Sequence, residues 1–119
     1  MPKTALFIDD EPEMTRILAN TFGSRGYQVF VANSGEEAIS ILERNHIDAV
    51  TLDLNMPGMD GIEVAAVMNK RFPNVKIIVV SGFGGEYDDQ LKTVKVDAHV
   101  PKPLNIAALL KKIPELIGN

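Results

Sequence analysis

Short apolar runs alternate along the chain with longer segments in which apolar residues recur at helical spacing. The short runs are four to six residues long and show no polar alternation; they cover residues 5–8, 27–32, 49–54 and 75–80. Runs of this kind are typical of parallel strands that helices cover on both faces. We therefore predict four buried strands at these positions.

The intervening segments place apolar residues three and four positions apart, as on one face of a helix. The three faces comprise Met14, Ile17, Leu18 and Phe22; Ala38, Ile39, Ile41 and Leu42; and Ile62, Val64, Ala65, Val67 and Met68. Start and stop signals agree with three helices. Pro12 suits a first helical position, Ser34 with Glu37 suits a cap, and Gly26 stands where the first helix is expected to end. His46 is expected to complete the cap at the end of the second helix.

The pattern weakens after residue 80. Residues 86–95 are polar apart from Leu91 and Val94, which predicts a short fourth helix. A brief strand is expected at residues 98–100, stopped by Pro101. The last helix presents Ile106, Leu109, Leu110 and Ile113 on one face, and we expect Pro114 to bend it.

Five strand–helix units in 119 residues predict an α/β fold with one domain, residues 1–119. A (β/α)8 barrel needs about twice this length. The expected architecture is a doubly wound, flavodoxin-like sheet of five parallel strands in the order 2-1-3-4-5, with helices on both faces. Ligands of such sheets bind beyond the carboxyl ends of the strands, where the strand order reverses.

The amino-acid composition argues against several classes of function. The chain has 16 acidic and 12 basic side chains, a net charge of −4, which is the wrong sign for direct nucleic-acid binding. It has no cysteine, so disulfides, thiolate metal sites and cysteine nucleophiles are excluded, and we expect a cytoplasmic protein. The first apolar run is far too short for a signal sequence or a membrane span, so we expect no membrane partner.

Polar side chains of complementary chemistry follow the predicted strands. Asp9 and Asp10 follow the first strand, Asp53 ends the third, Ser81 follows the fourth and Lys102 follows the fifth. In the predicted topology these side chains meet in one pocket. Three neighbouring carboxylates repel one another unless a cation neutralises them. Mg²⁺ fits best, because it takes few carboxylates, keeps waters and leaves positions for phosphate oxygens.

A lysine and a hydroxyl beside a metal suit a phosphoryl group. Asp53 is the best candidate nucleophile, because it ends a central strand and is followed by turn-forming residues; it would form an acyl phosphate. Asp9 and Asp10 would then hold the metal, aided by a backbone carbonyl after Asp53. Taken alone, the Asp9–Asp10 pair is equally consistent with an ordinary helix N-terminal cap.

These residues resemble the receiver domain of two-component response regulators, over essentially the whole chain. Four signatures carry the resemblance: Asp9-Asp10, Asp53 with the segment 55–61 (Asn-Met-Pro-Gly-Met-Asp-Gly), Ser81-Gly82, and Lys102-Pro103. Each is weak alone, and together they are specific. A chemotaxis protein of this family is itself a standard example of the 2-1-3-4-5 order, so fold and family are not independent inferences.

The resemblance implies that Asp53 accepts a phosphoryl group from the phosphohistidine of a histidine kinase or phosphotransfer protein, or from a small phosphodonor. It implies that Mg²⁺ is ligated by Asp10, Asp53 and the Asn55 carbonyl, with Asp9 acting largely through water. It further implies that the chain is a signalling switch, which catalyses only its own phosphorylation and dephosphorylation.

The resemblance also assigns the phosphoryl contacts. Ser81 and Lys102 would each bond a phosphoryl oxygen, and the peptide bond before Pro103 would be cis. Ser81 would be half of a switch whose other half is normally Tyr or Phe, and His99 occupies that second position. Leu54, Asn55, Gly82 and Phe83 would flank the phosphoryl group. Phe83 is expected to shield it from water and give it a long lifetime.

Phosphorylation is expected to alter the face made by the fourth helix, the fifth strand and the fifth helix. A downstream protein, a fused output domain or a second copy in a phosphorylation-dependent dimer would bind there. An aspartyl phosphohydrolase or phosphotransferase is an alternative, but it needs a second Asp where Asn55 stands. A flavin or nucleotide carrier needs a glycine-rich loop in place of Asp9-Asp10. A receiver-like binding module that is never phosphorylated is the remaining alternative.

Overall fold

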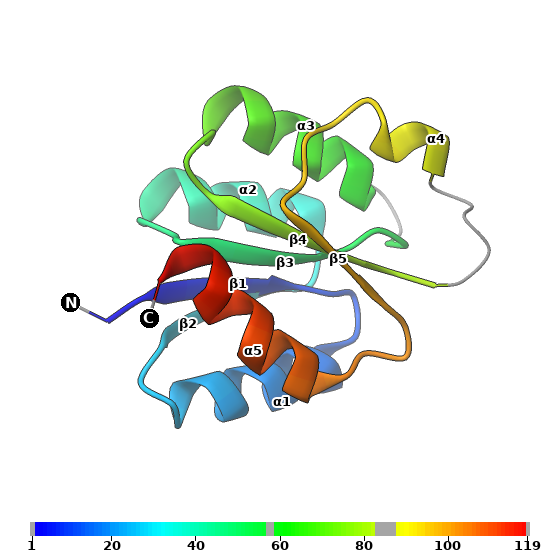
Figure 1. Cartoon of the computed structure of the whole chain (residues 1–119). Coiled ribbons are helices and arrows are strands. Elements are labelled where there is room, and N and C mark those ends of the chain that lie inside the picture. Colours follow the sequence, from blue (N-terminus) through cyan, green and yellow to red (C-terminus); the bar gives the residue numbers. More distant parts are fainter. Residues whose placement is uncertain (1, 57–58, 83–87, 119) are drawn as a thin grey trace.

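The computed structural model describes residues 2–56, 59–82 and 88–118, in which strands and helices alternate (Figure 1). The elements are β1 (Thr4–Ile8), α1 (Pro12–Gly23), β2 (Gln28–Ala32), α2 (Gly35–Arg44), β3 (Ala49–Asp53), α3 (Gly61–Arg71), β4 (Lys76–Ser81), α4 (Asp88–Leu91), β5 (Ala98–Pro101) and α5 (Ile106–Ile117). The short fourth helix lies within the segment predicted for it. The fifth strand begins at the predicted residue but includes Pro101, which was predicted to stop it.

The strands form one parallel sheet in the order β2-β1-β3-β4-β5. This confirms the predicted doubly wound, flavodoxin-like fold. Asp53 pairs in register with Val80, and Ser81 pairs with Pro101. The carboxyl ends of β3, β4 and β5 therefore lie at the same level of the sheet.

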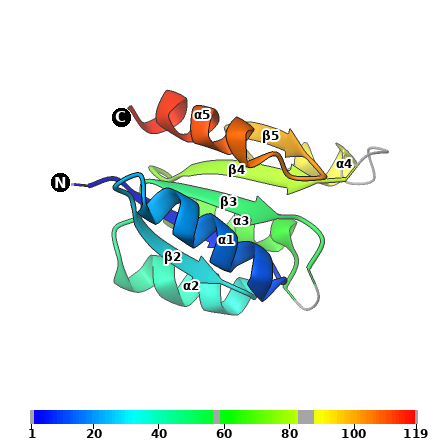
Figure 2. The same ribbon diagram turned by 90° about the horizontal axis from the view of Figure 1, so that it is seen from below.

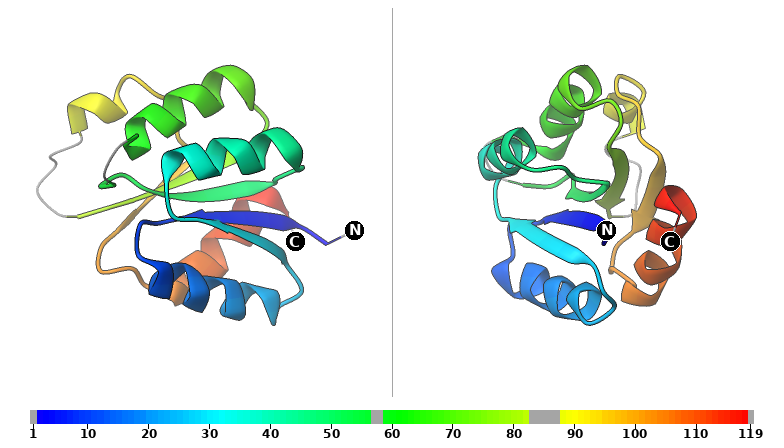
Figure 3. Two further views of the ribbon diagram at one scale, coloured as in Figure 1. Left: turned by 180° about the vertical axis from the view of Figure 1, so that it is seen from behind. Right: turned by 90° about the vertical axis from the view of Figure 1, so that its left-hand side faces the viewer.

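Helices cover both faces of the sheet. α2, α3 and α4 lie on one side, and α1 and α5 lie on the other (Figure 1; Figure 3). Figure 2 looks onto the second side and shows α1 and α5 in front of the strands. Each side has its own apolar core. The first includes Leu6, Val50, Leu52, Val64, Met68 and Val79, and the second includes Phe7, Leu18, Phe22, Ile78, Leu109 and Ile113.

The prediction that β2 is buried on both faces is wrong. Gln28 is exposed, and Val31 is 36% exposed. β2 is an edge strand with β1 as its neighbour in the sheet, so it is covered less than a central strand. The strand also begins one residue later than predicted. Tyr27 lies before it and is buried, with its ring edge-on to Phe22 at a centroid distance of 5.2 Å.

Two predicted helix ends are also wrong. α1 ends at Gly23, and Gly26 lies in the following turn with a φ of 92°, a conformation that favours glycine. His46 does not cap α2. Asn45 does so, because its Nδ2 donates to the carbonyl of Ile41 at 3.0 Å. The His46 ring contacts the Asp48 carboxylate at 3.0 Å instead.

Other predicted local features are confirmed. The hydroxyl of Ser34 accepts a hydrogen bond from the backbone N–H of Glu37 at 3.1 Å and caps α2. Pro12 is at the start of α1. α5 runs from Ile106 to Ile117 and contains Pro114, and the bend expected at this residue stays a prediction. Within the described residues, no helix has the length and apolar character needed to cross a membrane.

Candidate functional site

The sheet brings the predicted polar residues to its carboxyl edge. Asp9 follows β1, Asp53 and Ser81 are the last residues of β3 and β4, and Lys102 follows β5. Backbone hydrogen bonds keep these ends aligned. The N–H of Lys102 donates to the carbonyl of Ser81 at 2.8 Å, and the N–H of Leu54 donates to the carbonyl of Val80 at 3.1 Å.

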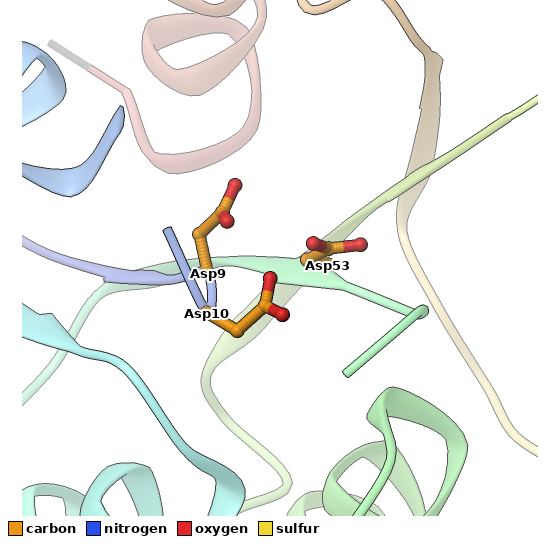
Figure 4. Close-up of side chains that lie close together, drawn as sticks. All are labelled: Asp9, Asp10 and Asp53. Atoms are coloured by element: carbon orange, nitrogen blue, oxygen red, sulfur yellow. The ribbon is translucent and has the colours of Figure 1, made fainter. Parts of the chain in front are cut away.

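Asp9, Asp10 and Asp53 form an acidic cluster (Figure 4). Each offers one carboxylate oxygen, and the three oxygens lie within 4.8 Å of one another. Asp10 is exposed, Asp9 is half-buried and Asp53 is only 2% exposed. The cluster therefore reaches from the surface to the end of a central strand.

The two oxygens of Asp53 have different surroundings. Oδ1 is 3.0 Å from the ammonium of Lys102 and accepts a hydrogen bond from the backbone N–H of Asn55, also at 3.0 Å. Oδ2 is buried and has no hydrogen-bond partner among the described residues. Leaving a buried carboxylate oxygen unpaired is costly, so such an atom usually has a functional explanation. The carboxylate of Asp53 lies in a cluster with two further carboxylates, where a cation could satisfy an unpaired oxygen.

Burial, the largest cause, and the nearby negative charge of Asp53 together raise the pKa of Asp9 to about 6. The hydrogen bond from the backbone N–H of Glu11, at 2.9 Å, and the positive charge of Lys102 act in the opposite direction. Burial lowers the pKa of Lys102, but the hydrogen bond and the charge of Asp53 outweigh this, so the net shift is upward. Lys102 is therefore a permanent cation, and the cluster holds excess negative charge.

The interpretation of Asp9 and Asp10 as a helix cap is correct only in part. The N-cap of α1 is Glu11, which makes no side-chain capping bond. Asp9 accepts the N–H of Glu11 itself, before the helix begins. Asn33, which sequence reasoning missed, donates to the Asp9 carbonyl at 2.8 Å and to the Thr15 hydroxyl at 3.2 Å. It follows β2, so the search for polar residues at strand ends would have found it.

The segment after Asp53 is anchored at both sides of the undescribed residues 57–58. Leu54 is fully buried and Asn55 is exposed. Asp60 caps α3 in a reciprocal capping box: its carboxylate accepts the N–H of Glu63 at 3.0 Å, and the Glu63 carboxylate accepts the N–H of Asp60. This cap was missed, although Asp followed by Glu three residues later is its sequence signal.

β4 and β5 supply the remaining groups. Ser81 is 5% exposed, and its Oγ lies 2.6 Å from Nε2 of His99. Gly82 is exposed, and the Lys102–Pro103 peptide bond is cis, as the resemblance implied. Phe83 lies outside the described residues, so its shielding of a phosphoryl group stays a prediction.

The donor set fits a hard divalent cation. It consists of oxygen atoms alone and carries net negative charge. It includes the carboxylate of Asp53, one oxygen of which is buried and has no hydrogen-bond partner in the part of the chain that the structure describes. These are the properties that Mg²⁺ selects. Lys102 on the other side of Asp53 adds a fixed positive charge toward which an anion would be drawn.

Comparisons with known proteins identify the relatives of this chain. The profile of the response regulator receiver domain matches residues 5–114. Sporulation initiation phosphotransferase F of Bacillus subtilis is 33% identical over 108 residues, covering 89% of this chain and 86% of that protein. The sensor histidine kinase RcsC of Escherichia coli is 52% identical over 56 residues, which cover 47% of this chain and 6% of the kinase.

A solved structure shares the whole fold. The response regulator protein TrrA of Thermotoga maritima, in complex with Mg(2+)-BeF, superposes with a TM-score of 0.83 and 32% identity, covering 96% of this chain and 98% of that one. The chain therefore belongs to the family of response regulator receiver domains, the phospho-accepting modules of two-component signalling.

Proposed function

We propose that this chain is a signalling switch in which Asp53 accepts the phosphoryl group in a Mg²⁺-dependent reaction. One observation carries the proposal: Asp53 is buried at the end of a central strand and clusters with two further carboxylates. Two donors hold one of its oxygens, and the other has no hydrogen-bond partner among the described residues. A carboxylate that served only the fold would have both oxygens satisfied.

The chemistry follows from these contacts. An Asp53 oxygen attacks the phosphorus of a phosphohistidine or of a small acyl phosphate. The new bond is an acyl phosphate, and the bond from phosphorus to the donor breaks, with its electron pair leaving on the donor. Lys102 stays protonated throughout and compensates charge on a phosphoryl oxygen, while the Ser81 hydroxyl donates to another.

Receiver domains typically use Mg²⁺ in an acidic pocket, and the acidic cluster supplies such a pocket here. We assign Asp10 and Asp53 as direct ligands, the Asn55 carbonyl as a third, and Asp9 as a contact through water. Bound Mg²⁺ would offset the negative charge shared by the carboxylates and the phosphoryl oxygens.

The test is intact-mass measurement after incubation with acetyl phosphate, with and without Mg²⁺. Wild type should gain the mass of one phosphoryl group only when Mg²⁺ is present. Asp53→Asn should gain none. Asp89→Asn is the matched control, because it removes the same charge from an almost fully exposed carboxylate in α4 and should behave like wild type.

The result also separates the alternatives. No mass gain under any condition would refute phosphorylation and leave a receiver-like binding module. Continuous release of inorganic phosphate with many turnovers would favour the phosphohydrolase. The sequence argues against a phosphohydrolase, because Asn55 occupies the position at which such an enzyme needs a carboxylate.

We further propose that the partner supplying the phosphoryl group is a histidine kinase or a phosphotransfer protein. A sensor kinase is among the relatives, which supports this source. The responding surface is the face made by α4, β5 and α5, because β5 leads directly into Lys102. A downstream protein, a fused output domain or a second copy would bind this face. Sedimentation of the phosphorylated chain tests the dimer.

A further inference from the structure

A hydrogen bond joins the phosphoacceptor edge to the outer strand of the sheet. Oγ of Ser81 and Nε2 of His99 are 2.6 Å apart. Ser81 is buried, whereas His99 is exposed, so the imidazole connects a buried hydroxyl to the surface. Neither partner belongs to the acidic cluster.

The strand register explains why these two side chains meet. His99 pairs with Val79 in the β4–β5 ladder, and Ser81 pairs with Pro101. Side chains two residues apart on a strand share a face, so His99 is a diagonal neighbour of Ser81. Val79 belongs to the core beneath α2 and α3, and Leu91 of α4 packs against that same core. The imidazole therefore lies on the face of the sheet that α4 covers.

The direction of the hydrogen bond decides what Ser81 can do. A hydroxyl has one proton to donate and two lone pairs that accept. If Nε2 of His99 lacks a proton, the Ser81 proton points at the imidazole and cannot reach a phosphoryl oxygen. If Nε2 carries a proton, His99 donates to Ser81 and the hydroxyl proton is available. Phosphoryl oxygens only accept, so they select the second arrangement.

We propose that His99 is a positioning residue for the phosphorylated state: its Nε2–H donates to Ser81 Oγ and directs the hydroxyl proton to a phosphoryl oxygen. The inference rests on the proposed function and adds a role that a Phe side chain cannot perform. Two hydrogen bonds in series, from imidazole to hydroxyl to phosphoryl oxygen, satisfy every donor and strengthen one another.

The first test is binding of Mg²⁺ and beryllofluoride, a phosphoryl stand-in, measured by titration. His99→Phe keeps a ring and loses the nitrogen, and its affinity should fall about three- to tenfold, as expected for one hydrogen bond. His99→Gln places an amide N–H the same number of bonds from the backbone and should restore most of the affinity. In the Ser81→Ala background the His99→Phe change should have no further effect, because the hydroxyl that it positions is gone.

A spectroscopic readout tests the proton directly. In ¹⁵N-histidine protein, the imidazole Nε2 of His99 should be protonated once Mg²⁺ and beryllofluoride are bound. His46 is the internal control, because it contacts Asp48 before β3, away from the acceptor edge. Its signals should not move. Circular dichroism of each variant establishes that it is folded.

The outcomes are distinguishable. If His99→Phe binds beryllofluoride as tightly as wild type, or more tightly, or if Nε2 is unprotonated in the bound state, this inference is overturned and the proposed function stands. Equal losses for His99→Phe and His99→Gln would also overturn it. If wild type binds no beryllofluoride with Mg²⁺ and gains no phosphoryl mass, both the proposed function and this inference are refuted.

Discussion

Replacing Gly61 by alanine should damage both the fold and the acceptor site. Gly61 is the first residue of α3 and packs against the end of β3. A Cβ there would lie 2.6 Å from Cα of Leu54 and 2.7 Å from the carbonyl oxygen of Asp53. The first contact is about 0.8 Å shorter than the 3.4 Å at which ordinary contact begins. Because both neighbours are backbone atoms, neither can rotate away.

The expected cost follows from that overlap. Overpacking a tight site costs about 1–3 kcal/mol, and a clash with backbone belongs at the upper end, so Gly61→Ala should lose about 3 kcal/mol of unfolding free energy. The backbone shift would also move Asp53 relative to Lys102, whose ammonium is now 3.0 Å from Oδ1. Misplacement of a reacting group by about 1 Å costs about a hundredfold in rate, so phosphorylation should slow about ten- to a hundredfold.

Urea unfolding followed by circular dichroism measures the stability, and intact mass against time measures the rate. Gly23→Ala is the matched control, because a Cβ at the end of α1 would meet no atom of the described residues within 4 Å. It should be neutral or stabilising by about 0.5 kcal/mol. A Gly61→Ala protein within about 0.5 kcal/mol of this control would refute the packing argument.

Further predictions concern charge and capping. Since the pKa of Asp9 is about 6, protons compete with Mg²⁺ for the acidic cluster, and the affinity of the chain for Mg²⁺ should fall as the pH drops below about 6. Asp9→Asn should flatten this dependence of Mg²⁺ affinity on pH, measured by calorimetric titration. Without Mg²⁺, the raised pKa means that the folded chain binds the proton more tightly than the unfolded chain. The contribution of Asp9 to stability is therefore greatest below about pH 4 and is lost as the pH rises to about 6. The loss is on the order of 1 kcal/mol after allowing for solvent screening. Measuring the free energy of unfolding between these pH values tests the sign of the change. Asp53→Asn should lower the pKa of Asp9, because it removes a neighbouring negative charge. The carboxyl ¹³C chemical shift of Asp9, followed against pH, measures this pKa, and an unchanged pKa in the variant would contradict the coupling of the two carboxylates. Asp60→Ala should cost about 1 kcal/mol by removing the cap of α3, and an unaltered urea midpoint would contradict that role.

Most of the architecture was predictable from local pattern. Apolar runs without alternation marked the strands, and their number and spacing specified a parallel sheet with helices on both faces. The errors arose where the context of a run mattered. Val31 belongs to as apolar a run as Val50, yet it is exposed because β2 lies at the edge of the sheet. The residues of a strand do not indicate whether it has one neighbouring strand in the sheet or two.

The site divides in the same way. The pattern of apolar runs was enough to predict which residues end the strands. It therefore also predicted that Asp9, Asp53 and Lys102 would converge, because parallel strands align their carboxyl ends. The hydrogen-bond partners became known from the folded chain alone. Oδ1 of Asp53 is held by two donors, Oδ2 has no partner among the described residues, and Ser81 bonds His99 on the neighbouring strand. Hydrogen-bond partners depend on distances of tenths of an ångström between segments far apart in the chain, and composition and spacing contain no such distances.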